Sequence, residues 1–397
     1  MNQTAELIPS LVAETIQIFQ KQFGSPPEIV TSAPGRVEIL GNHTDYNGGT
    51  VVGAGIGQRL EIGCSLRDDN AIHLHSTDTC QTSLESYTSD ELSEWCRYPL
   101  GVFDELRMLG KTNSERGFNL CVNSDVPVGA GLSSSAALEM AAALALTQLY
   151  AEDEGEFAMA DLVRISHRAE NRYVGIPCGL LDQTVVGYAK ADSMIILDAS
   201  TSRHSVLPTD GEASLVIFRS HISHDLAHSS YDSRHEECRQ ALMGLSRVIP
   251  GIRHLAHLDP IDIKAYDVVL DEKLARRARH VVEEQRRVGA FLKALNEGDH
   301  GAAGELMTAS HESSRTLFEN STPELDFLVQ QLNAKENVFG ARLSGAGWGG
   351  AVVALVGKAF SEKEAEEVID SYEEFFDIRP RWWHSEMCEG VRVDSRA

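Results

Sequence analysis

A glycine-rich turn that leads directly into a long alanine-rich helix constrains this chain more than any other feature. The stretch is "PVGAGLSSSAALEM", residues 127–140. Gly129 and Gly131 permit tight backbone torsions and the close approach of a ligand. The serines Ser133, Ser134 and Ser135 fall where the helix should begin, and the first amides of a helix carry partial positive charge and lack partners within it. The segment therefore predicts an anion site, and phosphate is the commonest occupant of such sites.

Two common catalytic turns do not match this segment. The chain contains no G-x-x-x-x-G-K-[ST] sequence, which excludes the Walker A loop, and no G-x-S-x-G nucleophile elbow. Alternatively, the serines only cap the helix. A second glycine-rich turn, "GARLSGAGWGG" at residues 340–350, lies between two apolar segments and alone would fit a tight hairpin. Together, the two turns favour a nucleotide-phosphate site between domains.

Composition narrows the class of protein. The chain has 397 residues, 42% of them hydrophobic and 24% charged, as in soluble globular proteins of two or three domains. Its formal net charge of −24 disfavours nucleic acid and anionic membrane surfaces as partners. A small phosphorylated ligand remains possible, because local backbone amides can override the global field. The seven scattered cysteines form no Cys-x-x-Cys pair, which predicts reduced thiols in a cytoplasmic protein.

The start of the sequence predicts a helix rather than a targeting segment. It has no basic n-region and no cleavable apolar core, and no stretch of about 18 apolar residues occurs anywhere in the chain. Apolar residues recur at helical spacing, which predicts an amphipathic first helix; they are Leu7, Leu11, Val12, Ile16 and Phe19.

The order of strands and helices predicts two mixed domains. Strands are expected at residues 28–40, interrupted by Pro34-Gly35, and then at 50–66, 71–77 and 117–127, followed by the helix after the glycine turn. A compositional change near residues 200–214 places the boundary, giving domains 1–205 and 206–397. The second half combines an apolar strand, long charged helices and the second glycine turn, which suits an α+β layer domain.

Phosphoryl transfer needs a phosphate cradle, magnesium ligands, a cation and a carboxylate that orients or deprotonates the attacking hydroxyl. The chain offers the turn at 129–135, Glu170 with a serine oxygen, Arg36 and Asp182 for these parts. Magnesium takes one or two hard oxygen ligands from protein and the rest from phosphate and water. A lone aspartate such as Asp182 is more often a helix cap or a surface group, so this residue alone decides little.

Several segments, in order, resemble motifs of the GHMP small-molecule kinases. "GRVEILGNHTDYNGG" resembles the galactokinase signature, "PVGAGLSSSAALE" the second GHMP motif and "GARLSGAGWGGAVVAL" the third. "AENRYVGIPCGLLDQ" is similar to the galactokinase segment that holds the catalytic aspartate, and "SSYDSRHEEC" to its tyrosine segment. The matches run from about residue 28 to beyond 350, so chance is a negligible explanation.

The resemblance implies an α+β fold of two domains, an N-terminal ribosomal-S5-like domain and a ferredoxin-like C-terminal domain, with the active site between them. It implies that ATP, with Mg²⁺, phosphorylates the anomeric C1 hydroxyl of galactose. The expected partners are the sugar and ATP, without nucleic acid or membrane, and a monomer is expected.

The resemblance also implies roles by position. Asp182 would be the base or orienting carboxylate, and Arg36 would stabilise its ionised form and the transferring phosphoryl group. The residues expected at the sugar are Asn42, His43, Asp45, Gly179 and Tyr231. Those expected at the ATP phosphates are Gly129, Gly131, Ser133, Ser134 and Ser135, and those at the metal are Ser135 and Glu170.

Two positions depart from the family pattern "GRVNLIGEHTDY". This chain has Glu38 where the family has asparagine, and Asn42 where the family has a glutamate that contacts the C6 hydroxyl. In one hypothesis Glu38 lies behind the pocket, hydrogen-bonds Asn42, and galactose remains the substrate. In the other, the pocket has shifted toward a sugar altered at C6, such as galacturonic acid. "YDSR" also replaces the usual Tyr-Asn after the tyrosine motif.

Other functional classes remain as alternatives. A catalytically silent galactose and ATP sensor shares this fold, but the known sensors lack part of the serine-alanine run that is intact here. Related GHMP kinases for substrates such as mevalonate lack the "HTDYNGG" segment. A hydrolase that uses the serines of the turn has no recognisable triad spacing.

Overall fold

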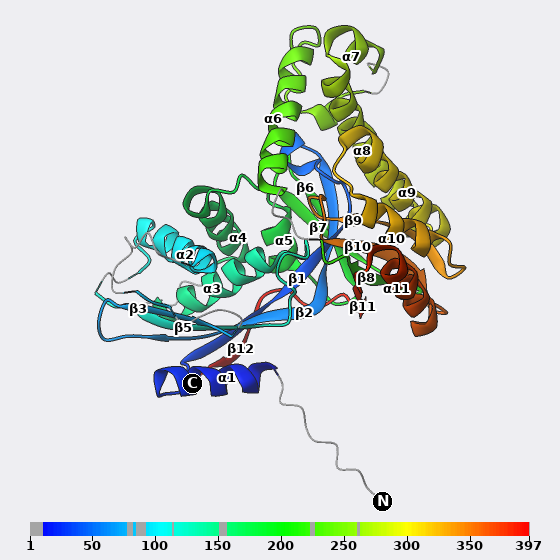
Figure 1. Ribbon diagram of the computed structural model, residues 1–397. Helices are drawn as coiled ribbons and strands as arrows, with labels where there is room; N and C mark the ends of the chain where they lie inside the picture. The colour runs from blue at the N-terminus through cyan, green and yellow to red at the C-terminus, as the bar shows by residue number, and fades with distance from the viewer. Residues whose placement is uncertain are drawn as a thin grey trace, which may run out of the picture.

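The computed structural model consists of two β-sheets with helices packed on them, and a helical projection beside the second sheet (Figure 1). Mixed helices and strands in both halves confirm the predicted α+β class. The structure describes residues 11–77, 82–84, 93–112, 115–150, 157–222, 227–259 and 263–396. Leu7, which we expected on the first helix, lies outside these residues.

The first sheet has the order β12-β1-β2-β5-β3-β4, and β6 and β7 extend it from β2. All its pairings are antiparallel except that of β3 with β5. Its strands are β1 (Ile29–Leu40), β2 (Thr50–Leu66), β3 (Ile72–Ser76), β4 (Thr82–Leu84), β5 (Phe118–Ser124), β6 (Ser193–Asp198), β7 (Arg203–Pro208) and β12 (Arg392–Arg396).

Helices cover both faces of this sheet. The predicted first helix is α1 (Leu11–Phe23), and it packs on one face, where the ring of Phe19 lies against Gly63 of β2. On the other face lies α3 (Ser134–Tyr150), together with α2 (Arg97–Met108), α4 (Met159–Arg168) and α5 (Leu181–Tyr188) (Figure 1). Small alanine side chains let α3 sit close to β1 and β2, so most of its residues are buried.

The second sheet is antiparallel, with the order β11-β8-β10-β9. Its strands are β8 (Ala213–Arg219), β9 (Val338–Ser344), β10 (Ala351–Gly357) and β11 (Arg381–Ser385). The helices α9 (His300–Ser313), α10 (Pro323–Asn333) and α11 (Glu362–Phe376) pack against it. The projection consists of α6 (Ala227–Leu245), α7 (Ile263–Val269) and α8 (Glu272–Asn296), which enclose their own small apolar core (Figure 1).

The expected break of the first strand at Pro34-Gly35 is wrong. β1 runs through both residues, and its register with β2 shifts between Pro34 and Arg36. The lost regularity is compensated from outside the sheet, because the Arg36 amide donates to the Leu132 carbonyl at 3.0 Å. A side chain at Gly35 would begin 2.9 Å from that same carbonyl oxygen, so glycine lets the 129–135 loop approach the strand.

The sequence did not predict four strands: β4, β7, β11 and β12. β7 crosses the expected boundary between residues 205 and 206, and β12 returns from the second half of the chain to pair with β1. The division into domains 1–205 and 206–397 therefore stays a prediction about folding units. Within the described part of the chain, every helix is too short or too polar to cross a bilayer.

Candidate active site

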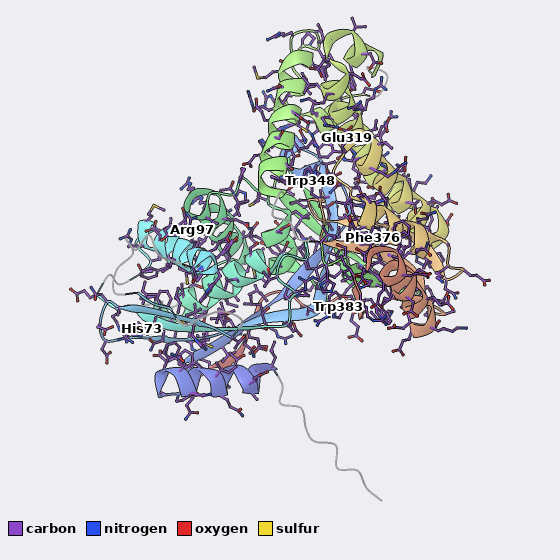
Figure 2. The ribbon with its side chains drawn as sticks, in the orientation of Figure 1. His73, Arg97, Glu319, Trp348, Phe376 and Trp383 are labelled. Atoms are coloured by element: carbon purple, nitrogen blue, oxygen red, sulfur yellow. The ribbon has the colours of Figure 1, made fainter. Side chains whose placement is uncertain are left out.

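A cavity of about 960 Å³ lies where the two halves of the molecule meet. Its walls come from β1 and the turn after it, the 129–135 loop, the start of α5 and the β9–β10 turn. Trp348 of that last turn lies at the lower end of α6 (Figure 2), where the guanidinium of Arg234 stacks 5.5 Å from its ring. The cavity gathers most of the residues that the sequence singled out.

Arg36 and Asp182 form the charged centre of the cavity. Arg36 donates from Nε to Asp182 Oδ1 at 2.8 Å and from Nη2 to Oδ2 at 2.7 Å. This two-bonded geometry fixes the carboxylate plane as well as its charge. The arginine is 7% exposed and the aspartate 27%, so the carboxylate is the member that a ligand can reach.

The 129–135 loop holds both members of this pair. Arg36 Nη1 donates to the Gly131 carbonyl at 2.7 Å, and the Ser133 hydroxyl donates to Asp182 Oδ2. Gly129, Gly131 and Ser133 all have positive φ, at 67°, 69° and 55°. These torsions turn the chain into α3, which begins at Ser134. The first amides of α3, which have no partner within the helix, therefore lie in the cavity next to the Arg36–Asp182 pair. The predicted junction of turn and helix is confirmed.

Ser135 and Glu170 lie side by side in the cavity wall. Glu170 is buried at the start of the π-turn Ala169–Val174 that continues α4, and burial raises the pKa of its carboxyl although Ser135 hydrogen-bonds to it. Gln183 Nε2 donates to Glu170 at 2.6 Å and to Glu139 at 3.1 Å. Burial raises the pKa of Glu139 well above its usual range.

The residues present fit a magnesium ion shared with a phosphate ligand. A hydroxyl and a carboxylate are the hard oxygen donors that Mg²⁺ prefers. No group of three or more His, Cys, Asp or Glu side chains arranged for a metal occurs among the described residues. A site at Ser135 and Glu170 would therefore draw its other ligands from phosphate and water.

Asp45 and Gly179 touch each other on the sugar side predicted for the cavity. A side chain at Gly179 would collide with the Asp45 carboxylate, so only glycine leaves room for it. Burial is the main reason why the pKa of Asp45 is raised, to about 7, and the nearby carboxylates Glu38 and Asp182 add to the shift.

His43 and Tyr231 lie together in an aromatic cluster, with ring centroids 5.5 Å apart. His43 Nε2 lies 2.9 Å from the Ala346 carbonyl, and Nδ1 lies 2.9 Å from the Tyr46 hydroxyl. A carbonyl only accepts, so Nε2 carries the proton and Nδ1 accepts from Tyr46. Burial lowers the pKa of His43 to about 3, which keeps the ring neutral. Both ring nitrogens are thus already engaged.

Asn42 is fully buried, and all its hydrogen-bonding groups are satisfied by protein. Its Nδ2 donates to Glu38 at 2.9 Å and to the Gly345 carbonyl at 2.8 Å. Its Oδ1 accepts from Ser314 at 3.1 Å and Asn320 at 2.8 Å. The expected hydrogen bond between Glu38 and Asn42 is present, and the amide has no further capacity for a ligand.

The backbone of Asn42 is anchored to α8. Its amide donates to Glu284 Oε1 at 3.1 Å, and its carbonyl lies 3.0 Å from His280 Nε2. Burial alone would raise the pKa of Glu284, but Arg287, His280 and other donors lower it to about 2. A buried, ionised glutamate thus holds the turn after β1 against the second half of the molecule.

Glu38 forms a buried ion pair with Arg342 of β9. Arg342 Nη1 lies 3.1 Å from Glu38 Oε1, the oxygen that also accepts from Asn42. Burial raises the pKa of Glu38, while Arg342, Asn42 and Arg36 lower it. Sequence reasoning missed Arg342, although a charged residue between Ala341 and Leu343 in an apolar strand was a visible signal.

Comparisons with known proteins agree with this geometry. The N-terminal domain of GHMP kinases matches residues 97–190, the galactokinase galactose-binding signature matches 17–65, and the GHMP kinase C-terminal domain matches 291–378. The galactokinase of Roseiflexus sp. (strain RS-1) is 36% identical over 356 residues, which is 89% of this chain and 90% of the relative. That of Staphylococcus carnosus is 34% identical over 385 residues, or 94% and 97%.

Solved structures show the same relationship. Lactococcus lactis galactokinase complexed with galactose matches with a TM-score of 0.90 at 30% identity, covering 96% of this chain and 100% of that one. A mevalonate kinase, at 18% identity and a TM-score of 0.62, covers 91% and 100% and shares the fold. Fold and site thus define the GHMP class of small-molecule kinases, which confirms the predicted two-domain architecture. Within this class, the chain belongs to the galactokinase family.

Proposed function

We propose that this protein transfers the γ-phosphoryl group of ATP to the anomeric C1 hydroxyl of galactose, giving galactose 1-phosphate and ADP. The observation that carries the proposal is the Arg36–Asp182 pair, bonded directly to the loop that opens α3. A sugar hydroxyl at Asp182 would thus lie beside a phosphate bound at the helix start.

In this reaction the C1 oxygen bonds to the γ-phosphorus as the bond from that phosphorus to the β–γ bridging oxygen breaks. The hydroxyl proton passes to the Asp182 carboxylate, which is the exposed member of its ion pair. Arg36 keeps that carboxylate aligned through its two hydrogen bonds, and its positive charge offsets charge on the transferring group. The free amides at Ser134 and Ser135 hold phosphate oxygens.

The proposed metal ligands are Ser135 and Glu170. Mg²⁺ bound there would neutralise phosphate charge during transfer. Gln183 and the Cys178 thiol, whose sulfur lies 3.1 Å from Glu170 Oε2, keep the carboxylate in place.

For the sugar, we assign direct hydrogen bonds to Asp45 and Tyr231, with the backbone of Gly179 closing the wall. His43 and Asn42 act differently, because their polar side-chain atoms already have protein partners. They hold the turn after β1 in shape. A cytoplasmic location, a monomeric state and the absence of nucleic acid and membrane partners remain predictions from the sequence.

A substrate panel with purified protein, ATP and Mg²⁺ tests the proposal. ADP release should be fastest with galactose, compared with galacturonate, L-arabinose, N-acetylgalactosamine and mevalonate. Galactose binding without ADP release would indicate a sensor, and a higher kcat/KM on galacturonate would refute galactose as the substrate.

A further inference from the structure

We propose that Glu38 is the residue that selects the sugar at C6, by accepting a hydrogen bond from the C6 hydroxyl. This inference rests on the proposed function, and it concerns a position where the chain departs from the family pattern. Glu38 lines the cavity, its side chain is 8% exposed, and it is held from behind by Arg342.

The first step concerns which oxygen of the Glu38 carboxylate can accept a further hydrogen bond. Both hydrogen bonds to Glu38 from other side chains, those of Asn42 and Arg342, end on Oε1. No hydrogen bond joins Oε2 to any residue that the structure describes. Since Glu38 is part of the cavity wall, Oε2 is the oxygen available to a ligand.

The second step is the placement along β1. Arg36, Val37 and Glu38 pair in unbroken register with β2, so Arg36 and Glu38 share one face of the strand. Two residues of a strand span about 7 Å, comparable with the length of a hexose with its exocyclic groups. A sugar whose C1 hydroxyl meets Asp182 beside Arg36 therefore presents its opposite end to Glu38.

The third step distinguishes the hydroxyls at that end. Glu38 is recessed in the wall, and a hydroxyl on an exocyclic carbon extends one bond beyond the ring. The C6 hydroxyl thus reaches a recessed acceptor more easily than a ring hydroxyl does. Asn42 does not compete for it, because its amide is saturated by four protein partners.

The charge of the site gives the direction of selectivity. Glu38 faces the cavity and is ion-paired with Arg342, so a C6 carboxylate would meet a like charge there. The pocket accordingly rejects galacturonate, and a sugar without the C6 hydroxyl leaves Oε2 of the buried carboxylate without a hydrogen-bond donor.

The test begins with substrate analogues on the unaltered protein. The ratio of kcat/KM for galactose to that for 6-deoxygalactose should be about 10 to 100. The 6-deoxy-6-fluoro analogue should be as poor as the 6-deoxy sugar, because fluorine cannot donate to a carboxylate. Equal rates on all three sugars would overturn the proposal, whereas no turnover of any sugar would instead refute the proposed function.

Variants then assign the effect to Glu38. Glu38→Gln should lower the galactose to 6-deoxygalactose ratio about tenfold and raise the relative rate on galacturonate. Glu61→Gln, which changes another buried glutamate of the first sheet, is the matched control and should leave both unchanged. An unchanged ratio in folded Glu38→Gln would contradict the assignment.

A double substitution keeps the question open to test if Glu38→Gln fails to fold. Glu38→Asn combined with Asn42→Glu exchanges the bonded pair while keeping one carboxylate and one amide. It should discriminate against 6-deoxygalactose at least tenfold, and urea unfolding should show it to be more stable than Asn42→Glu alone, which places two carboxylates in contact. Equal rates of the folded double variant on galactose and 6-deoxygalactose would contradict the proposal that a carboxylate of this pair binds the C6 hydroxyl.

Discussion

The guanidinium of Arg36 and the carboxylate of Asp182 meet through parallel hydrogen bonds of 2.8 and 2.7 Å, although 146 residues separate them in the chain. The Ser133 hydroxyl and the Gly131 carbonyl of the 129–135 loop bond to the same pair. Strand, loop and helix start are therefore fixed relative to one another before any ligand binds, which lowers the cost of aligning two substrates.

Asp182→Asn should lower kcat with galactose about 100- to 10,000-fold, because the amide cannot take the C1 proton. Nucleotide affinity, measured by calorimetry, should change little, since the amides of the helix start are untouched. Asp68→Asn, at an exposed surface position, is the matched control. Near-native kcat in folded Asp182→Asn would remove this residue from the reaction.

Gly179→Ala should raise KM for galactose at least about tenfold with a smaller change in kcat, because the added methyl group displaces the Asp45 carboxylate. Gly57→Ala is a close control, since a methyl group there meets no atom within 4 Å. Steady-state kinetics of both variants check the expectation. A KM equal to that of Gly57→Ala would show that Asp45 does not bind the sugar.

Asp45 should make folding stability depend on pH. Its pKa is about 7 in the folded protein and about 3.9 when unfolded, so between these values only the folded state holds the proton. The free energy of unfolding should therefore fall as pH rises from about 4 to about 7. Asp45→Asn should make this decline shallower in urea titrations without ligand.

Glu61→Gln is the control that distinguishes the effect of Asp45 on folding stability from its effect on galactose binding. Burial raises the pKa of Glu61 to about 7 as well, but this residue bonds Thr15 under α1. Both variants should show the shallower decline. Galactose affinity should rise between pH 6 and 8 in the unaltered protein and in Glu61→Gln, because an ionised Asp45 accepts stronger hydrogen bonds. The same rise in Asp45→Asn would exclude Asp45 as its cause.

Arg342→Met should lower the free energy of unfolding by about 3–5 kcal/mol, because Glu38 would be left as an unpaired buried charge. The double variant with Glu38→Gln should lose less free energy of unfolding than the two single variants lose in total. Urea midpoints of the four proteins in the cycle measure the coupling. Strict additivity would mean that the two side chains do not stabilise each other.

Ser135→Ala and Glu170→Gln should each raise the Mg²⁺ concentration needed for half-maximal activity. They should also weaken Mn²⁺ binding in the presence of ADP, followed by electron paramagnetic resonance, because each change removes an oxygen donor. Glu212→Gln, at an exposed pair with Lys358, is the control. Unaltered Mn²⁺ binding in both variants would place the metal elsewhere.

Local patterns in the sequence were sufficient for α1, for α3 and for the turn at 129–135 that precedes α3. The junction before Ser134 was predictable because glycine torsions and helix-start amides act within a few residues. The strands β7 and β12 were missed, because edge strands with exposed polar residues lack the apolar alternation that marks a buried strand.

Long-range contacts limited the prediction of the site. Asn42 resembles a ligand-binding residue in sequence, but Ser314, Asn320 and Gly345 reach it from more than 270 positions away and occupy its amide. Nothing within the N-terminal segment reveals such partners. The sequence shows Arg342 only as an unusual charged residue in an apolar strand. That it forms an ion pair with Glu38 is visible only in the folded structure.

The pairing of β12 with β1 means that one edge of β1 stays unpaired during most of protein synthesis. β1, which carries Arg36, leaves the ribosome long before β12, the strand that pairs with it at Ile29–Ser32. At about 5–20 residues per second, that edge stays unpaired for tens of seconds. An unpaired strand edge can pair with a strand of another chain. We therefore expect nascent chains on the same messenger RNA to need chaperones bound at this edge of β1 until residues 392–396 emerge.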